Sequence, residues 1–275
     1  MVTDFEEFCG GSPFWNESLL LDGSYPQFTE CFMTTALVWG PCGLLWLALP
    51  GYWFYIANMA ARSPIPLNKL SVIKTVLCLV LCAVSLVQLV HHVIEDQDSF
   101  PAVYVADGVK TATFILAATI VQIERRCGRI NSPPLFLFWF LMIVCNIVPL
   151  YTYVEEQVYE SDSLEFSIHC LLFGTLTIQL LVFSFADKRE RHGYLEMSQL
   201  ASKELTASLP SILSMYWINK TIRAGFRKTL KEDDINDLHP DDVCEKQVPR
   251  FAKAWRAEVD RTNVINDKYS LQHAN

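Results

Sequence analysis

The sequence predicts an all-α membrane protein, in which a bundle of five transmembrane helices is followed by a cytoplasmic linker with amphipathic helices. Two observations predict this fold class. Hydrophobic residues make up 51% of the 275-residue chain and gather in long blocks instead of being spread along it. Lys and Arg, in contrast, occur in alternate connections between those blocks. The blocks give the number of spans, and the positive charges give the direction of crossing.

The transmembrane domain is predicted to cover residues 32–186, after an N-terminal segment over 1–31. A helix needs about 20 apolar residues to cross a hydrocarbon layer roughly 30 Å thick, and only a closed helix satisfies its backbone groups there. Five blocks reach this length, and the chain after Asp187 is too polar to span. The predicted spans are Phe32–Ile56, Val72–Val90, Val103–Ile123, Leu135–Val154 and Phe166–Ala186.

The distribution of positive charge predicts an N-terminus outside the cell and a C-terminus in the cytoplasm. Residues 1–31, 91–102 and 155–165 contain no Lys or Arg, whereas the connections at 57–71 and 124–134 contain several. Lys and Arg are retained on the cytoplasmic side. The net charge of −8 comes largely from the outer segments. It therefore reflects topology, and we expect no nucleic-acid partner.

The outer N-terminal segment carries two candidate modification sites. Asn16 begins an Asn-Glu-Ser acceptor for N-glycosylation in a compartment where that modification occurs. Cys9 and Cys31 are the only cysteines on the oxidising side. We expect a disulfide between them that ties this segment to the first span, the alternative being two free thiols.

Four ionisable residues fall inside predicted spans, where a charge is costly. Asp107 and Lys110 are three residues apart on one helix face and are predicted to pair. Lys74 is predicted to extend to the cytoplasmic headgroups, and His169 to make a hydrogen bond between helices. Cys78 and Cys82 share a helix face without further ligands, so no metal site is expected. No cofactor is predicted for this chain.

The linker is predicted to cover residues 187–260, with a polar, disordered tail over 261–275. Within it, residues 211–231 have two rows at helical spacing. One row is apolar, the other consists of the cations Lys220, Arg223 and Arg227, and Trp217 lies in the same segment. This pattern is typical of a helix lying in the inner headgroup layer of the lipid bilayer, although an ordinary soluble amphipathic helix is the alternative. A second helix, over 243–259, has an apolar row that predicts one buried face.

The chain resembles the N-terminal region of the multidrug resistance-associated proteins, subfamily C of the ABC transporters. The resemblance extends over nearly the whole chain. It is carried by PQFTECFMTTALVWGPCGLLW at 26–46, PLNK at 66–69 and VQIERR at 121–126, then by LPSILSMYWINKTIRAGFRKTL at 209–230 and VPRFAKAW at 248–255.

This resemblance implies an accessory five-helix domain followed by the lasso linker of an exporter of glutathione conjugates and other organic anions. The implied partner is the exporter's transport core, in cis in a longer product or in trans. Trp217 would then be the aromatic anchor, while Arg223 and Arg227 contact lipid phosphate or core carboxylates. A free-standing scaffold that docks on another membrane protein, such as an ion channel, is the alternative.

The chain itself is not expected to be an enzyme. It contains no G-x-x-x-x-G-K-[ST] loop for nucleotide phosphates, so ATP and Mg are expected only in a full-length relative. The plasma membrane is the expected location, and a vacuolar or lysosomal membrane is the alternative.

Overall fold

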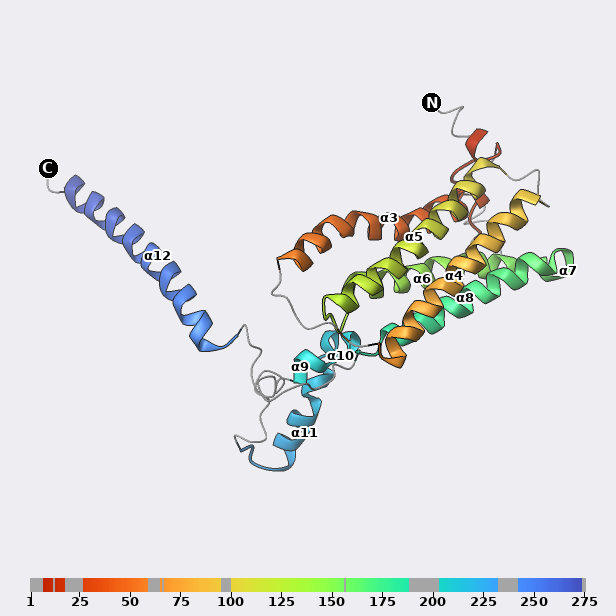
Figure 1. Cartoon of the computed structure of the whole chain (residues 1–275). Helices are drawn as coiled ribbons and strands as arrows, with labels where there is room; N and C mark the ends of the chain where they lie inside the picture. Colours follow the sequence, from red (N-terminus) through yellow and green to blue (C-terminus); the bar gives the residue numbers. More distant parts are fainter. Residues whose placement is uncertain are drawn as a thin grey trace. The chain divides into compact units, whose positions relative to one another are not determined.

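A computed structural model describes residues 7–11, 13–17, 27–58, 65, 67–94, 100–155, 157–187, 203–231 and 242–273 (Figure 1). Within these ranges the regular secondary structure is helical, with no strand. The chain divides into two compact units. The membrane unit comprises Met1–Glu190 with Ser208–Pro210, and the linker unit comprises Arg191–Ala207 with Ser211–Asn275.

Five helices in the described residues are long and apolar enough to cross a membrane, which confirms the predicted number of spans. Each lies within a few residues of its prediction. The clearest difference is in the second span, which continues through His91 and His92 into residues assigned to a connection. The spans are α3 (Glu30–Ala57), α4 (Lys69–Ile94), α5 (Pro101–Arg126), α6 (Pro133–Glu155) and α8 (Ser163–Phe183).

Local sequence explains where several of these helices begin and end. The Thr29 side chain caps α3 by accepting a hydrogen bond from the Phe32 N–H. Pro101 and Pro133 open α5 and α6, where the missing N–H of proline costs little. Gly128 follows α5 with φ of 69°, a left-handed conformation that favours glycine, and its N–H donates to the Arg125 carbonyl.

The five spans form a closed ring in the order α3, α5, α4, α8, α6, with α6 packing back on α3. Figure 1 shows them running side by side. Buried rings fill the centre. Phe114 of α5 stacks on Trp139 of α6 with centroids 6.0 Å apart, and the Phe183 ring of α8 lies 6.0 Å from the same indole. Because aromatic rings bury a large area, this cluster fixes three helices together.

The helices between residues 203 and 231 are short, and they correct one prediction. The continuous helix expected over 211–231 is interrupted at Met215, whose φ of 54° is incompatible with a right-handed helix. It then ends at Arg227, because Lys228 is extended. The elements are α9 (Lys203–Thr206), α10 (Leu209–Leu213), the 3₁₀ helix η1 (Tyr216–Ile218) and α11 (Asn219–Arg227).

The last helix, α12 (Cys244–His273), is longer than predicted and takes in most of the tail that was expected to be disordered. After Pro249 the sequence has no Gly or Pro to end a helix, and Arg261 lies 3.7 Å from Glu258 one turn away. The apolar row expected to be buried is exposed instead. Val248, Phe251 and Trp255 are 60%, 67% and 60% exposed, because no other described residue of the chain covers them.

Candidate functional site

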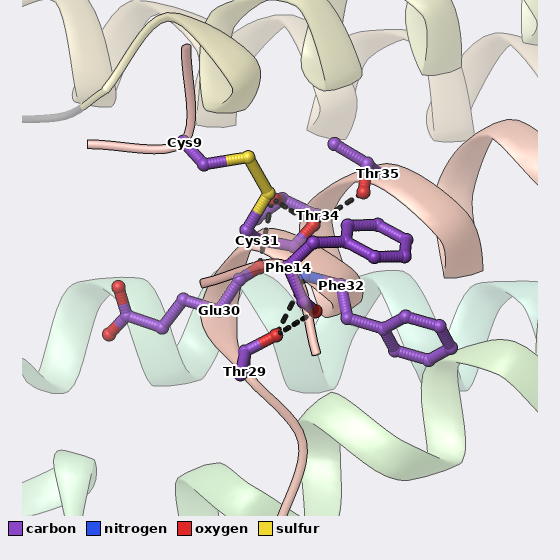
Figure 2. The surroundings of a disulfide bond; sticks show 8 residues. All are labelled: Cys9, Phe14, Thr29, Glu30, Cys31, Phe32, Thr34 and Thr35. Atoms are coloured by element: carbon purple, nitrogen blue, oxygen red, sulfur yellow. Dashed lines mark hydrogen bonds between the residues drawn. A yellow bond between two sulfur atoms is a disulfide. The ribbon is translucent and has the colours of Figure 1, made fainter. Parts of the chain in front are cut away.

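The N-terminal segment is fastened to the start of α3 in the manner that the cysteines predict. Cys9 and Cys31 are joined in a disulfide, with their Cα atoms 5.4 Å apart (Figure 2). The Thr29 hydroxyl donates to the Phe14 carbonyl at 2.6 Å, and the Phe14 ring packs edge-on against Phe32 with centroids 5.5 Å apart. A covalent bond, a hydrogen bond and an aromatic contact therefore hold this segment in one place.

Asn16 lies in the same segment and is half-buried. Ser18, the hydroxyl residue of the acceptor sequence, is outside the described residues. Glycosylation of Asn16 therefore stays a prediction.

The pair predicted inside the third span is present and belongs to a larger polar cluster between α4 and α5. Lys110 Nζ lies 2.7 Å from one carboxylate oxygen of Asp107, and His92 Nδ1 lies 2.7 Å from the other. Lys110 also donates to the side-chain carbonyl of Gln88 at 3.1 Å. All four side chains are buried. Sequence reasoning missed His92 and Gln88, although both lie on the α4 face that carries the buried residues of that helix.

His169 has the packing role expected of it, since its ring lies edge-on to Tyr153, with centroids 5.0 Å apart, and hydrogen bonds the backbone of Asn146. These contacts join α8 to α6. Tyr153 in turn donates to Glu165 at 2.8 Å. Within the described residues no group of three or more His, Cys, Asp or Glu side chains could hold a metal ion.

Lys74 corrects a prediction. It does not extend away from the protein but is buried, with Nζ 2.8 Å from Asp187 Oδ2 and 3.4 Å from the Phe185 carbonyl. Asp187 comes just after α8 and lies 113 positions from Lys74, so no local pattern in the sequence indicates it as the partner. A buried cation needs a nearby anion, and here the segment after the last span supplies it.

A buried acid near this end of the bundle was also missed. Glu124, near the end of α5, accepts a short hydrogen bond from the Tyr52 hydroxyl of α3. It is 5% exposed. The predicted third span ends at Ile123, so Glu124 falls in the predicted connection at 124–134. The hydrogen bond links two neighbouring spans of the ring.

The residues predicted to contact lipid or a partner lie together in the linker unit. Lys220, Arg223 and Arg227 are one turn apart on α11 and, with Trp217 of η1, line a groove of about 710 Å³. The groove also includes Lys228, which lies within the predicted helix, and Lys203 of α9, which spacing along a single helix could not have revealed. Within 203–231 no Asp or Glu lines it. The arrangement is a strongly basic concave surface with an aromatic wall.

Comparison of the sequence with models of known protein families identifies the family. A model described as the ABC transporter TMD0 domain matches residues 6–170. The chain belongs to this family. It is the N-terminal TMD0 region of an ABC subfamily C protein, and hence a multi-pass membrane protein.

The relatives extend the similarity past the TMD0 domain into the linker. The chain is 31% identical to human ATP-binding cassette sub-family C member 3 and 30% identical to the mouse protein of the same name, in each case over 94% of its length. Human sub-family C member 2 is 27% identical over 93% of it. The chain spans only 16 to 18% of the length of these curated relatives.

Proposed function

We propose that this chain is the accessory and regulatory membrane module of an ATP-dependent exporter of glutathione conjugates and other organic anions. It acts on the transport core in trafficking, assembly or gating, in cis in a longer product or in trans. Membership of the TMD0 family supports the class of protein. The match to sub-family C members over more than 90% of the chain supports including the linker, and not only the five helices, in the module.

The observation that carries a partner-binding role is the exposed apolar row of α12. The rings of Phe251 and Trp255 stack with centroids 5.9 Å apart, and both are more than half exposed. Val248 continues the row one turn earlier at 60% exposure. Large aromatic side chains of this kind are common energetic centres of protein interfaces. The transport core is the partner proposed to cover them.

The proposed orientation has the N-terminus outside and the linker in the cytoplasm, at the plasma membrane. The asymmetry of Lys and Arg supports it, because the ends of the bundle at Ala57–Lys69 and Arg126–Pro133 carry the basic residues, while the connection between α6 and α8 is acidic. A disulfide between Cys9 and Cys31 is consistent with an oxidising exterior at the other end.

The test uses a subfamily C transport core that lacks its own N-terminal region, co-expressed with this chain. We expect the two to co-purify in detergent and to restore ATP-dependent uptake of a glutathione conjugate into inside-out vesicles. Trp255→Glu places a charge in the exposed row and is expected to weaken association at least tenfold. Lys253→Glu, which reverses a charge on another face of α12, is the matched control. Equal recovery of the core by both variants would contradict the proposed contact.

A further inference from the structure

The basic groove of the linker unit has features of a ligand site and not only of a charged surface. Five cations line it, from three places in the sequence. Lys203 belongs to α9, Lys220, Arg223 and Arg227 belong to α11, and Lys228 directly follows α11. Within residues 203–231 no Asp or Glu joins the lining, and since like charges repel, the three cations Lys220, Arg223 and Arg227 on one helix favour a bound anion.

The chemistry of the cations indicates which anion. Arg223 and Arg227 are one turn apart on the same face of α11 and present planar guanidinium groups, which match phosphate oxygens in a bidentate manner. A phosphate monoester carries close to two negative charges and three strong acceptor oxygens, whereas the diester of an ordinary anionic lipid carries one charge. Five cations around about 710 Å³ suit a headgroup with several charges, since small-molecule sites are roughly 300–1,000 Å³ in size.

The neighbouring residues favour a lipid as the source of this phosphate. The row of α11 next to the cations is apolar, and Ile222 and Phe226 are 61% and 93% exposed. Met215, just before η1, is 71% exposed. A soluble anion would leave these side chains in water. A lipid in the adjacent leaflet covers them with acyl chains while its headgroup enters the groove, as in interfacial helices.

We propose that the groove formed by α9, η1 and α11 binds the phosphate-monoester headgroup of an inner-leaflet lipid, of the phosphoinositide class. Arg223 and Arg227 hold the phosphate, Lys203, Lys220 and Lys228 supply the remaining positive charge, and Trp217 packs at the wall of the groove. The inner-leaflet assignment rests on the orientation in the proposed function. The binding site itself does not depend on the presence of a transport core.

The experiment uses the full chain in detergent micelles, without a transport core. Native mass spectrometry measures the binding of three probes: a short-chain phosphatidylinositol bisphosphate, a short-chain phosphatidylserine, and soluble inositol trisphosphate. We expect the bisphosphate lipid to bind at least tenfold more tightly than either other probe. If the bisphosphate lipid binds more tightly than phosphatidylserine, the groove recognises the monoester phosphates and the charge that they add. If it binds more tightly than inositol trisphosphate, the acyl chains contribute to binding.

The variant Arg223→Gln with Arg227→Gln should weaken binding of the bisphosphate lipid at least tenfold. Arg250→Gln with Arg256→Gln removes the same charge from α12 and should change it less than twofold. Both pairs are exposed, so neither change should affect folding, which helix content by circular dichroism checks. Equal binding of the two lipids, equal binding of the soluble headgroup, or equal losses in the two variants would each overturn the proposal. Because no core is present, none of these results depends on the proposed accessory role.

Discussion

Removing the carboxylate of Asp107 tests whether the polar cluster between α4 and α5 is a structural centre of the bundle. Asp107→Ala removes the carboxylate that His92 and Lys110 each contact at 2.7 Å, and within the described residues the Lys110 ammonium keeps the hydrogen bond to the Gln88 side chain at 3.1 Å. The site is 2% exposed at Asp107 and 8% at Lys110, so solvent cannot replace the lost contacts.

The loss in free energy of unfolding caused by Asp107→Ala distinguishes two explanations of the cluster. If the contacts act as ordinary hydrogen bonds within a membrane protein, at about 0.6 kcal/mol each, the variant loses roughly 1 kcal/mol. If Lys110 is left as an uncompensated buried charge, the loss is about 3–5 kcal/mol. The burial of both charges favours the larger value. At about 2–4 °C per kcal/mol for a domain of this size, the midpoint of thermal unfolding should fall by roughly 6–20 °C.

The assay heats the purified protein in detergent and measures the monodisperse fraction by size-exclusion chromatography. Glu155→Gln, which neutralises an exposed carboxylate at the end of α6, is the control and should leave the midpoint unchanged. Asp107→Ala with Lys110→Met removes both charges and should recover most of the loss. A single variant as stable as the unmodified protein, or a double variant no better than the single one, would refute the charge-pair explanation.

Three further predictions concern other parts of the chain. Lys74→Met leaves the carboxylate of Asp187 without its 2.8 Å partner and should cost about 1.5–3 kcal/mol in the same thermal assay, whereas Lys69→Met, at an exposed position, should cost nothing measurable. An impermeant maleimide should label neither Cys9 nor Cys31 in intact cells until a reductant is added; labelling before reduction would contradict the disulfide. The purified chain should show no saturable labelling by an azido-ATP analogue, and labelling that unlabelled ATP abolishes would contradict this.

The long apolar blocks predicted the five spans because hydrophobic length is a local property of sequence, and the spacing of Asp107 and Lys110 predicted their contact for the same reason. His92 was missed because it lies beyond the apolar core of its block, where helix and connection have similar composition. The partners of Lys74 and Tyr52 come from more than 70 residues away, and no local pattern encodes them. The cations on α11 were predicted from their spacing, whereas Lys203 reaches the groove because α9 contacts η1, and no local pattern encodes that contact.

The ion pair between Lys74 and Asp187 has a consequence for biosynthesis. The two residues are 113 positions apart, and α4, which carries the cation, is made before three more membrane-spanning helices. Until the ribosome has synthesised Asp187, the carboxylate that pairs with Lys74 is not yet part of the chain. The ion pair between Lys74 and Asp187 can therefore form only after the first residues beyond the last span have been synthesised. A chain halted earlier lacks the carboxylate that Lys74, near the start of α4, contacts at 2.8 Å in the finished module, so the cost of burying this cation in a span is then less fully offset.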